Sequence, residues 1–218
     1  MLQYAQSVRR LVKIVVKSAK NDISNFWRYG SIAPLYAERI WVNAQDCEKA
    51  IHSKYLTGSE LRADTGKVLH YDFPEKDIVK VEELDKVRYC IEHWVNGIPW
   101  EDTGAYEYTM QKIQSKGGKF DGCLTIDDVV NRFSSIDKMF DTVRKEGRLR
   151  SRKELNPCNF REMNGVYVHI GPDGKLFFGR GGNHRFAIAL ILDLRIPAQI
   201  GCVHYTSFYK LPELRTSS

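Results

Sequence analysis

The chain has 218 residues, of which 43% are hydrophobic and 11% aromatic, and its formal net charge is +6. This apolar content is enough for a folded core and excludes an intrinsically disordered chain. The positive charge favours an anionic partner, such as a nucleotide, a nucleic acid or an anionic lipid. No apolar run approaches the length that spans a bilayer, which excludes the membrane-spanning class.

The five cysteines lie far apart and form no Cys-x-x-Cys pair, which argues against a zinc site. Their odd number, and a start that lacks the pattern of a signal peptide, predict reduced thiols in a cytoplasmic protein.

Residues 1–38 are predicted to form a basic N-terminal helix followed by an aromatic connector. Residues 1–20 hold five basic residues and no acidic one, with apolar residues at helical spacing. Such a helix docks on the body with a solvated basic face, lies on an anionic membrane surface, or binds nucleic acid. The aromatic residues that follow either stack on a ligand or fasten the connector to the body. They are Trp27, Tyr29, Tyr36 and Trp41.

Residues 39–210 are predicted to form one α+β domain, a small mixed sheet with packed helices, carrying an insertion at about 52–119. Residues 39–42 have the pattern of a strand, and a helix is expected to start near Asp46 and to include Ala50 and Ile51. Within the insertion, residues 79–95 have helical spacing, and an ordered loop over 98–106 leads into another helix. Residues 211–218 are expected to be a frayed tail.

The second half of the chain has clearer local signals. Thr125 and Asp128 form a capping box, followed by an apolar helical face that Ser134 restarts and Gly147 ends. Residues 149–155 are expected to be a strand. A hairpin is predicted over 166–178, with its turn at 171–174, then a buried helix and a last strand over 198–205.

Between the hairpin and the buried helix lies the sequence Phe-Gly-Arg-Gly-Gly-Asn-His-Arg, residues 178–185. Glycines allow the backbone to turn tightly and to approach a ligand closely. The first amides of a helix lack internal partners and lie at its positive end, which suits a phosphate group. We therefore predict a phosphate site in which Gly181, Gly182 and Asn183 supply backbone donors. His184 and Arg185 are its expected side-chain ligands.

The order strand, Asp-Gly turn, strand, Gly-Gly-x-His-Arg turn, small-residue helix and final strand resembles the core of the ParB and sulfiredoxin superfamily. The likeness covers residues 120–208, with residues 40–46 as the first strand. In that family the turn binds nucleotide phosphates. Asn183 stands where sulfiredoxin has its reactive cysteine, so sulfinic acid reductase activity is not expected. The chain ends soon after the last strand, so the DNA-reading module of ParB is not expected either.

The family also includes small-molecule kinases, and this branch implies a nucleoside triphosphate, ATP or CTP, with Mg²⁺ as the expected metal. Phosphoryl transfer then needs a carboxylate base. Asp46 matches the position after the first strand, while Glu101 and Asp102 are rivals from the insertion. Arg150 and Arg152 are expected either to reach the phosphates or to form a solvated basic edge.

The leading hypothesis is a nucleotide-dependent phosphotransferase or nucleoside triphosphate hydrolase that acts on a small-molecule or glycan acceptor. One alternative is a ParB-like nucleic-acid binder, which is disfavoured because the basic excess lies in residues 1–20 and outside the motif. The other is a nucleotide-regulated accessory protein at the inner membrane surface.

Overall fold

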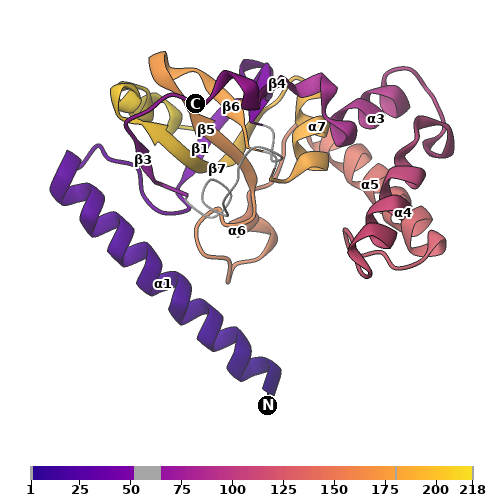
Figure 1. Cartoon of the computed structure of the whole chain (residues 1–218), viewed down its shortest axis with the longest axis horizontal. Helices are drawn as coiled ribbons and strands as arrows, with labels where there is room; N and C mark the ends of the chain where they lie inside the picture. The colour runs from indigo at the N-terminus through magenta and orange to yellow at the C-terminus, as the bar shows by residue number, and fades with distance from the viewer. Residues whose placement is uncertain (1, 52–64, 180, 218) are drawn as a thin grey trace.

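The computed structural model describes residues 2–51, 65–179 and 181–217, with the backbone alone over 2–10. A mixed β-sheet lies at the centre, and helices pack on it or extend from it (Figure 1). The strands are β1 (Arg39–Asn43), β2 (Lys49–Ile51), β3 (Val68–Leu69), β4 (Ile78–Lys80), β5 (Val166–Ile170), β6 (Leu176–Phe178) and β7 (Arg195–His204). The α-helices are α1 (Leu2–Tyr29), α3 (Asp85–Trp94), α4 (Ala105–Lys116), α5 (Ile126–Glu146), α6 (Arg152–Leu155), α7 (Asn183–Ile191) and α8 (Leu211–Leu214). The predicted α+β class is confirmed.

The sheet is organised around its longest strand, β7. The strand order is β1-β7-β5-β6-β2-β4, and β3 pairs with the far end of β7. β7 runs antiparallel to β1 and parallel to β5, while β5 and β6 form the predicted antiparallel hairpin. Nine of the ten residues of β7 are buried, so its continuous apolar run reflects cover on both faces.

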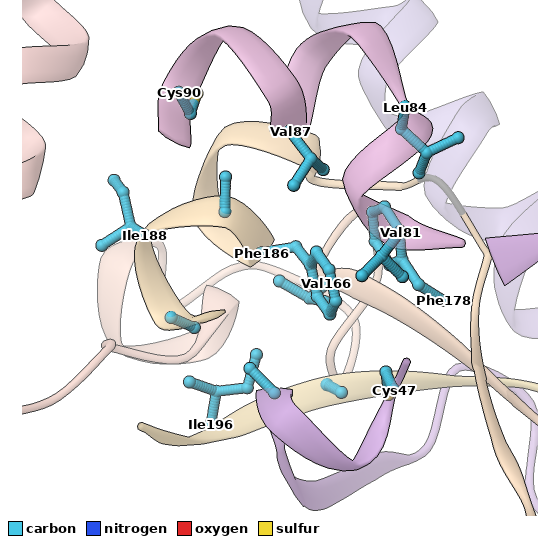
Figure 2. Packing of buried hydrophobic residues seen from close by; sticks show 14 of the residues in the cluster. Cys47, Val81, Leu84, Val87, Cys90, Val166, Phe178, Phe186, Ile188 and Ile196 are labelled. Carbon is cyan, nitrogen blue, oxygen red and sulfur yellow. The ribbon is translucent and has the colours of Figure 1, made fainter. Parts of the chain in front are cut away.

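The hairpin feeds directly into α7, the most deeply buried helix. Phe186 of α7 stacks on Phe178 of β6 with ring centroids 3.9 Å apart. Figure 2 shows α7 between α3 on one side and the sheet on the other, with Val87 and Ile196 on the two flanking elements. The predicted strand–turn–helix order at this point is confirmed, and the helix is apolar all round because it has neighbours on both sides.

Helices α3, α4 and α5 form a group beside α7 (Figure 1). The short 3₁₀ segment Trp100–Thr103 belongs to the same group of helices. Its Trp100 indole N–H donates to Asp137 Oδ2 on α5 at 2.9 Å. The capping box of Thr125 and Asp128 is present, and α5 ends at Gly147, whose φ is 65°. Ser134 does not restart α5, which is one continuous helix, because its apolar positions stay in phase throughout.

Besides the restart at Ser134, five predicted elements are wrong, and each was an expectation from local pattern. The helix expected over 79–95 begins only at Asp85, because residues 78–80 form β4 and pair with β2. The helix expected from Asp46 is instead β2, because Ala50 and Ile51 are buried between β4 and β6. A short apolar run fits a buried strand as well as a helix, and pairing with distant strands decides between them. The last strand begins at Arg195, two residues before Pro197, rather than at Ala198.

The other two errors concern short polar segments. Residues 152–155 form α6 instead of a strand, because Ser151 and Glu154 make a second capping box. The expected tail is ordered as far as α8, whose Leu211 and Leu214 are buried. Arg215 then pairs with Glu38 at 2.6 Å.

The N-terminal helix is longer than expected and runs through the first part of the predicted connector. α1 ends only at Tyr29, where Gly30 takes a positive φ of 79°. Its N-terminal half extends away from the sheet (Figure 1). The start of the predicted insertion, residues 52–64, and Arg180 of the motif lie outside the described residues.

Candidate functional site

The glycine turn is packed against the start of β5. Gly182 precedes α7 with a φ of 70°, a conformation that favours glycine. A Cβ at Gly182 would lie 3.1 Å from the carbonyl oxygen of Gly165, and one at Gly181 would lie 2.8 Å from the Cβ of Tyr167. Both glycines are therefore required by close backbone approach. The N-cap residue of α7 is Gly182, which has no side chain to cap the helix, and the first amides of a helix are suited to donate to an anion.

A cavity of about 440 Å³ opens beside this turn. Gly179, Gly181 and Gly182 are part of its lining, and Lys17 contributes to the lining from α1. The rest of the lining is Tyr36, Thr65, Met163, Asn164, Gly165, Tyr167 and Gln199. The volume lies in the range of small-molecule sites. Of the aromatic residues singled out in the sequence, Tyr36 lines this cavity, whereas Tyr29 instead hydrogen-bonds His70 at 2.8 Å.

His184 does not line this cavity. Its side chain is 8% exposed and packs against Tyr89 and Phe133, with ring centroids 6.3 and 5.9 Å away. Burial lowers the pKa of His184 from 6.5 to about 3, helped by the positive charges of Lys86 and Arg132. The imidazole is therefore neutral near pH 7 and lies among aromatic rings. Its predicted role as a phosphate ligand or catalytic group is not supported by this position.

Arg185 faces a second hollow. Its guanidinium donates from Nη2 to the carbonyl oxygen of Arg150, and its Nε and Nη1 have no hydrogen-bond partner among the described residues. Burial lowers the pKa of Arg185 to about 10, so the side chain stays charged. With Arg150 it lines a separate cavity of about 330 Å³ beside α5. Arg185 and the three glycines of the turn therefore line different cavities.

Glu162 is the buried residue that sequence reasoning missed. Its side chain is fully buried, and Oε1 accepts a hydrogen bond from the Arg152 amide at 2.7 Å. Desolvation raises the pKa of Glu162, against the lowering effect of that amide bond and of Arg185. Glu162 lies in an irregular segment without periodicity, so no local signal could have indicated it. Its carboxylate is attracted electrostatically by Arg185, Arg39 and Arg152.

Arg150 and Arg152, which the sequence suggested as phosphate ligands, instead make contacts within the fold. Arg150 is exposed and pairs with Glu146 one turn earlier, with Nη2 to Oε1 at 2.5 Å. Arg152 begins α6 and gives its amide to Glu162. Neither lines the cavity at the glycine turn.

The candidate bases are not brought to the glycine turn. Asp46 lies in the 3₁₀ segment Ala44–Asp46, which packs at the far end of α7, where Gln45 donates to the Leu190 carbonyl at 2.9 Å. Since α7 is about 13 Å long, Asp46 and the turn are at opposite ends of one helix. Asp46 lines another cavity, of about 920 Å³, with residues of β2, β4 and β6.

Glu101 and Asp102 are exposed on the segment that joins α3 and α4, and they line no part of the cavity at the turn. Among the described residues, no three His, Cys, Asp or Glu side chains lie close enough to hold a metal ion. The structure therefore places the phosphate turn and the three candidate carboxylates apart.

Comparison with family models, with curated proteins and with solved structures finds no match to this chain. The likeness to the ParB and sulfiredoxin superfamily thus rests on the motif and the order of elements alone. Within the described part of the chain, no helix combines the length and the apolar character needed to cross a membrane.

Proposed function

We propose that this chain binds a nucleoside triphosphate, ATP or CTP, in the cavity beside the glycine turn. The observation that carries the proposal is that Gly179, Gly181 and Gly182 line the same hollow of about 440 Å³ as Lys17. This arrangement differs from the one expected from sequence. The cation comes from α1, whereas the side chains of His184 and Arg185 contact other parts of the fold and do not line the hollow.

The glycines leave the backbone accessible where a phosphate would approach. A Cβ at Gly179 would lie 2.4 Å from the Tyr167 ring, so this position has no room for a side chain. Amides at the start of α7 can donate to phosphate oxygens, and the helix dipole favours negative charge there. Lys17 is the one cationic side chain among the described residues of the lining, and it supplies a point charge for the phosphates.

Two polar side chains of the lining, Thr65 and Gln199, are already held in place by hydrogen bonds to the backbone. Thr65 accepts a hydrogen bond from the Ala37 amide at 3.0 Å and donates to the Ile200 carbonyl. Gln199 accepts from the Asn164 amide at 2.8 Å. Because these groups are fixed before a ligand arrives, little conformational entropy is lost on binding. Tyr36 and Tyr167 also belong to the lining, and the Lys17 ammonium lies 5.6 Å from the centre of the Tyr36 ring.

Transfer or hydrolysis of the terminal phosphate is the reaction class that the family resemblance implies, with a small-molecule or glycan acceptor. The described lining contains no carboxylate, so it offers neither a base nor a protein ligand for Mg²⁺. The described lining therefore supports binding of a nucleotide and supplies no group for the transfer itself.

Thermal unfolding with and without ATP or CTP tests the proposal. Either nucleotide is expected to raise the midpoint of unfolding, since a ligand that binds the folded state stabilises it. Lys17→Met keeps the aliphatic length and removes the charge, and it should weaken binding about tenfold or more, the loss of one charge-assisted contact. Lys145→Met, at the exposed end of α5, is the matched control and should bind like the parent.

Arg185→Ala is a poor test, because it removes a buried side chain and one of the positive charges that attract Glu162. The proposal fails if isothermal titration detects no ATP or CTP binding at millimolar concentration. It also fails if Lys17→Met binds as tightly as Lys145→Met.

A further inference from the structure

Helix α1 is attached to the body through polar side chains on one side. Asp22 accepts from the Tyr36 amide at 2.6 Å and pairs with Arg161 at 2.8 Å. The Asn25 amide donates to the carbonyl oxygens of Pro34 and Gly66, each at 2.7 Å. Amphipathic helices usually pack against a protein body through their apolar side. α1 packs through polar side chains instead, so its apolar side lies on another part of the helix surface.

The apolar side of α1 is exposed. Trp27 is 81% exposed, and the other large members of this side are exposed as well. They are Val12, Val15, Val16, Ile23 and Phe26. At about 100° per residue these positions form one continuous stripe roughly 120° wide. We call it the apolar stripe of α1. Contiguous apolar surface of this kind marks a binding site in a folded protein.

A basic sector follows the stripe around the helix. Lys13 and Lys20 lie immediately beside it, and both are exposed. The first 21 residues of the chain contain no Asp or Glu. The first acidic residue, Asp22, is already paired with Arg161. The surface beside the stripe at Lys13 and Lys20 is therefore positive, and the one acidic residue of α1 is already neutralised by an arginine of the body.

We infer that α1 binds the surface of an anionic membrane, lying in its plane with the apolar stripe in the headgroup region. Aromatic and aliphatic residues on one side, with lysines at the edge, are the features of helices that lie on membranes. Lysines next to the stripe then meet anionic headgroups. The apolar stripe and the docked side have centres about 120° apart around α1, so the body can stay on the aqueous side.

Charge argues against a second copy of α1 on this surface, and the composition of the stripe argues against a nucleic acid. A second copy of α1 packed stripe to stripe would bring Lys13 and Lys20 toward the same residues of the partner, which is unfavourable. A nucleic acid needs cations and aromatic rings on one surface. Of the six stripe residues, only Phe26 and Trp27 are aromatic and the other four are aliphatic, which suits a lipid surface better than the bases of a nucleic acid.

Flotation of the full chain with lipid vesicles tests this inference. Binding is expected to vesicles that contain phosphatidylglycerol and not to vesicles of phosphatidylcholine alone. Lys13→Gln combined with Lys20→Gln should weaken binding about 30-fold, because each lysine near an anionic surface contributes about fivefold. Ile23→Ser combined with Phe26→Ser should weaken it at least as much. Val130→Ser, an exposed apolar residue on α5, is the matched control.

Tryptophan fluorescence gives a second measurement. Trp27 is the most exposed tryptophan, so its emission should shift to shorter wavelength on vesicle binding, and Trp27→Phe should abolish the shift. Equal binding by all variants, or no binding to anionic vesicles, overturns the inference. A concentration-dependent dimer or nucleic-acid complex lost in the Ile23 and Phe26 variant, without vesicle binding, also overturns it. None of these outcomes depends on nucleotide binding.

Discussion

Two buried histidines predict that the protein loses stability in mild acid. His169 on β5 is almost completely buried, and its Nδ1 accepts a hydrogen bond from the Cys202 amide at 3.0 Å. His184 is enclosed by Tyr89 and Phe133. Burial lowers the pKa of both histidines from 6.5 to about 3. Both are therefore neutral in the folded protein at a pH where the unfolded chain protonates them.

The sign and size of the effect follow from linkage. The folded pKa of each histidine lies below the unfolded one, so the stabilisation is present above pH 6.5 and is lost as the pH falls toward 3. Near pH 4.5 each histidine reduces the free energy of unfolding by about 3 kcal/mol relative to neutral pH. Together they approach the whole stability of a typical domain, about 5–15 kcal/mol.

Urea unfolding across a series of pH values measures this loss. His184→Gln removes one titrating group while keeping a polar side chain, and His169→Gln does the same on β5. Near pH 5.5 each substitution should reduce the slope of unfolding free energy against pH by about 1 kcal/mol per pH unit. If His184→Gln leaves the slope unchanged, or the His184 imidazole titrates near pH 6.5 by NMR, the reasoning about this residue is wrong.

Two further predictions concern the segment under the glycine turn. The pKa of Glu162 is raised in the folded state, so its contribution to stability is present below its ordinary pKa of 4.5 and is lost as the pH rises through the raised pKa. Glu162→Gln should therefore gain stability relative to the parent as the pH rises, which urea unfolding at two pH values detects; a constant difference would contradict this. Gly182→Ala should destabilise the protein by about 1–2 kcal/mol from its positive φ, with an added penalty from contact with Gly165. Gly147→Ala, at a similar φ with open space around it, isolates the backbone part, and equal losses of thermal stability would exclude the contact.

Local signals in the sequence were enough for the elements around the turn. Alternating apolar residues and an Asp-Gly turn specify β5 and β6, and the glycines followed by small apolar residues specify α7. The capping box at Thr125 likewise fixes the start of α5. Each of these signals lies within a few residues of the element that it determines.

Other elements depend on partners far away in the chain. β2 and β4 have three residues each, and they are strands because they pair with each other and β2 with β6. Nothing within residues 46–51 distinguishes that outcome from a helix. The last turns of α1 were hidden for a similar reason. Asp22 and Asn25 are poor helix formers, and their bonds to the body offset that preference.

The divergence of the site from expectation has a geometric cause. Successive residues of a helix point about 100° apart, so His184 and Arg185 cannot both face the side on which Gly181 and Gly182 open. Tyr89 of α3 and Phe133 of α5 enclose the imidazole, and the Arg150 carbonyl accepts a hydrogen bond from the guanidinium. A motif gives the residues near a turn, whereas the neighbours of the helix decide which of them reach the ligand.

Lys17 links the two proposals, because it lines the cavity and belongs to α1. It lies about 140° around the helix from the centre of the apolar stripe, on the opposite flank of the docked side. We therefore expect a membrane that contacts Trp27 and Ile23 to leave the cavity open. The polar bonds of Asp22 and Asn25 hold α1 against the body at the same time. The two proposals are thus compatible on one helix, and substitutions in the stripe should leave nucleotide affinity unchanged.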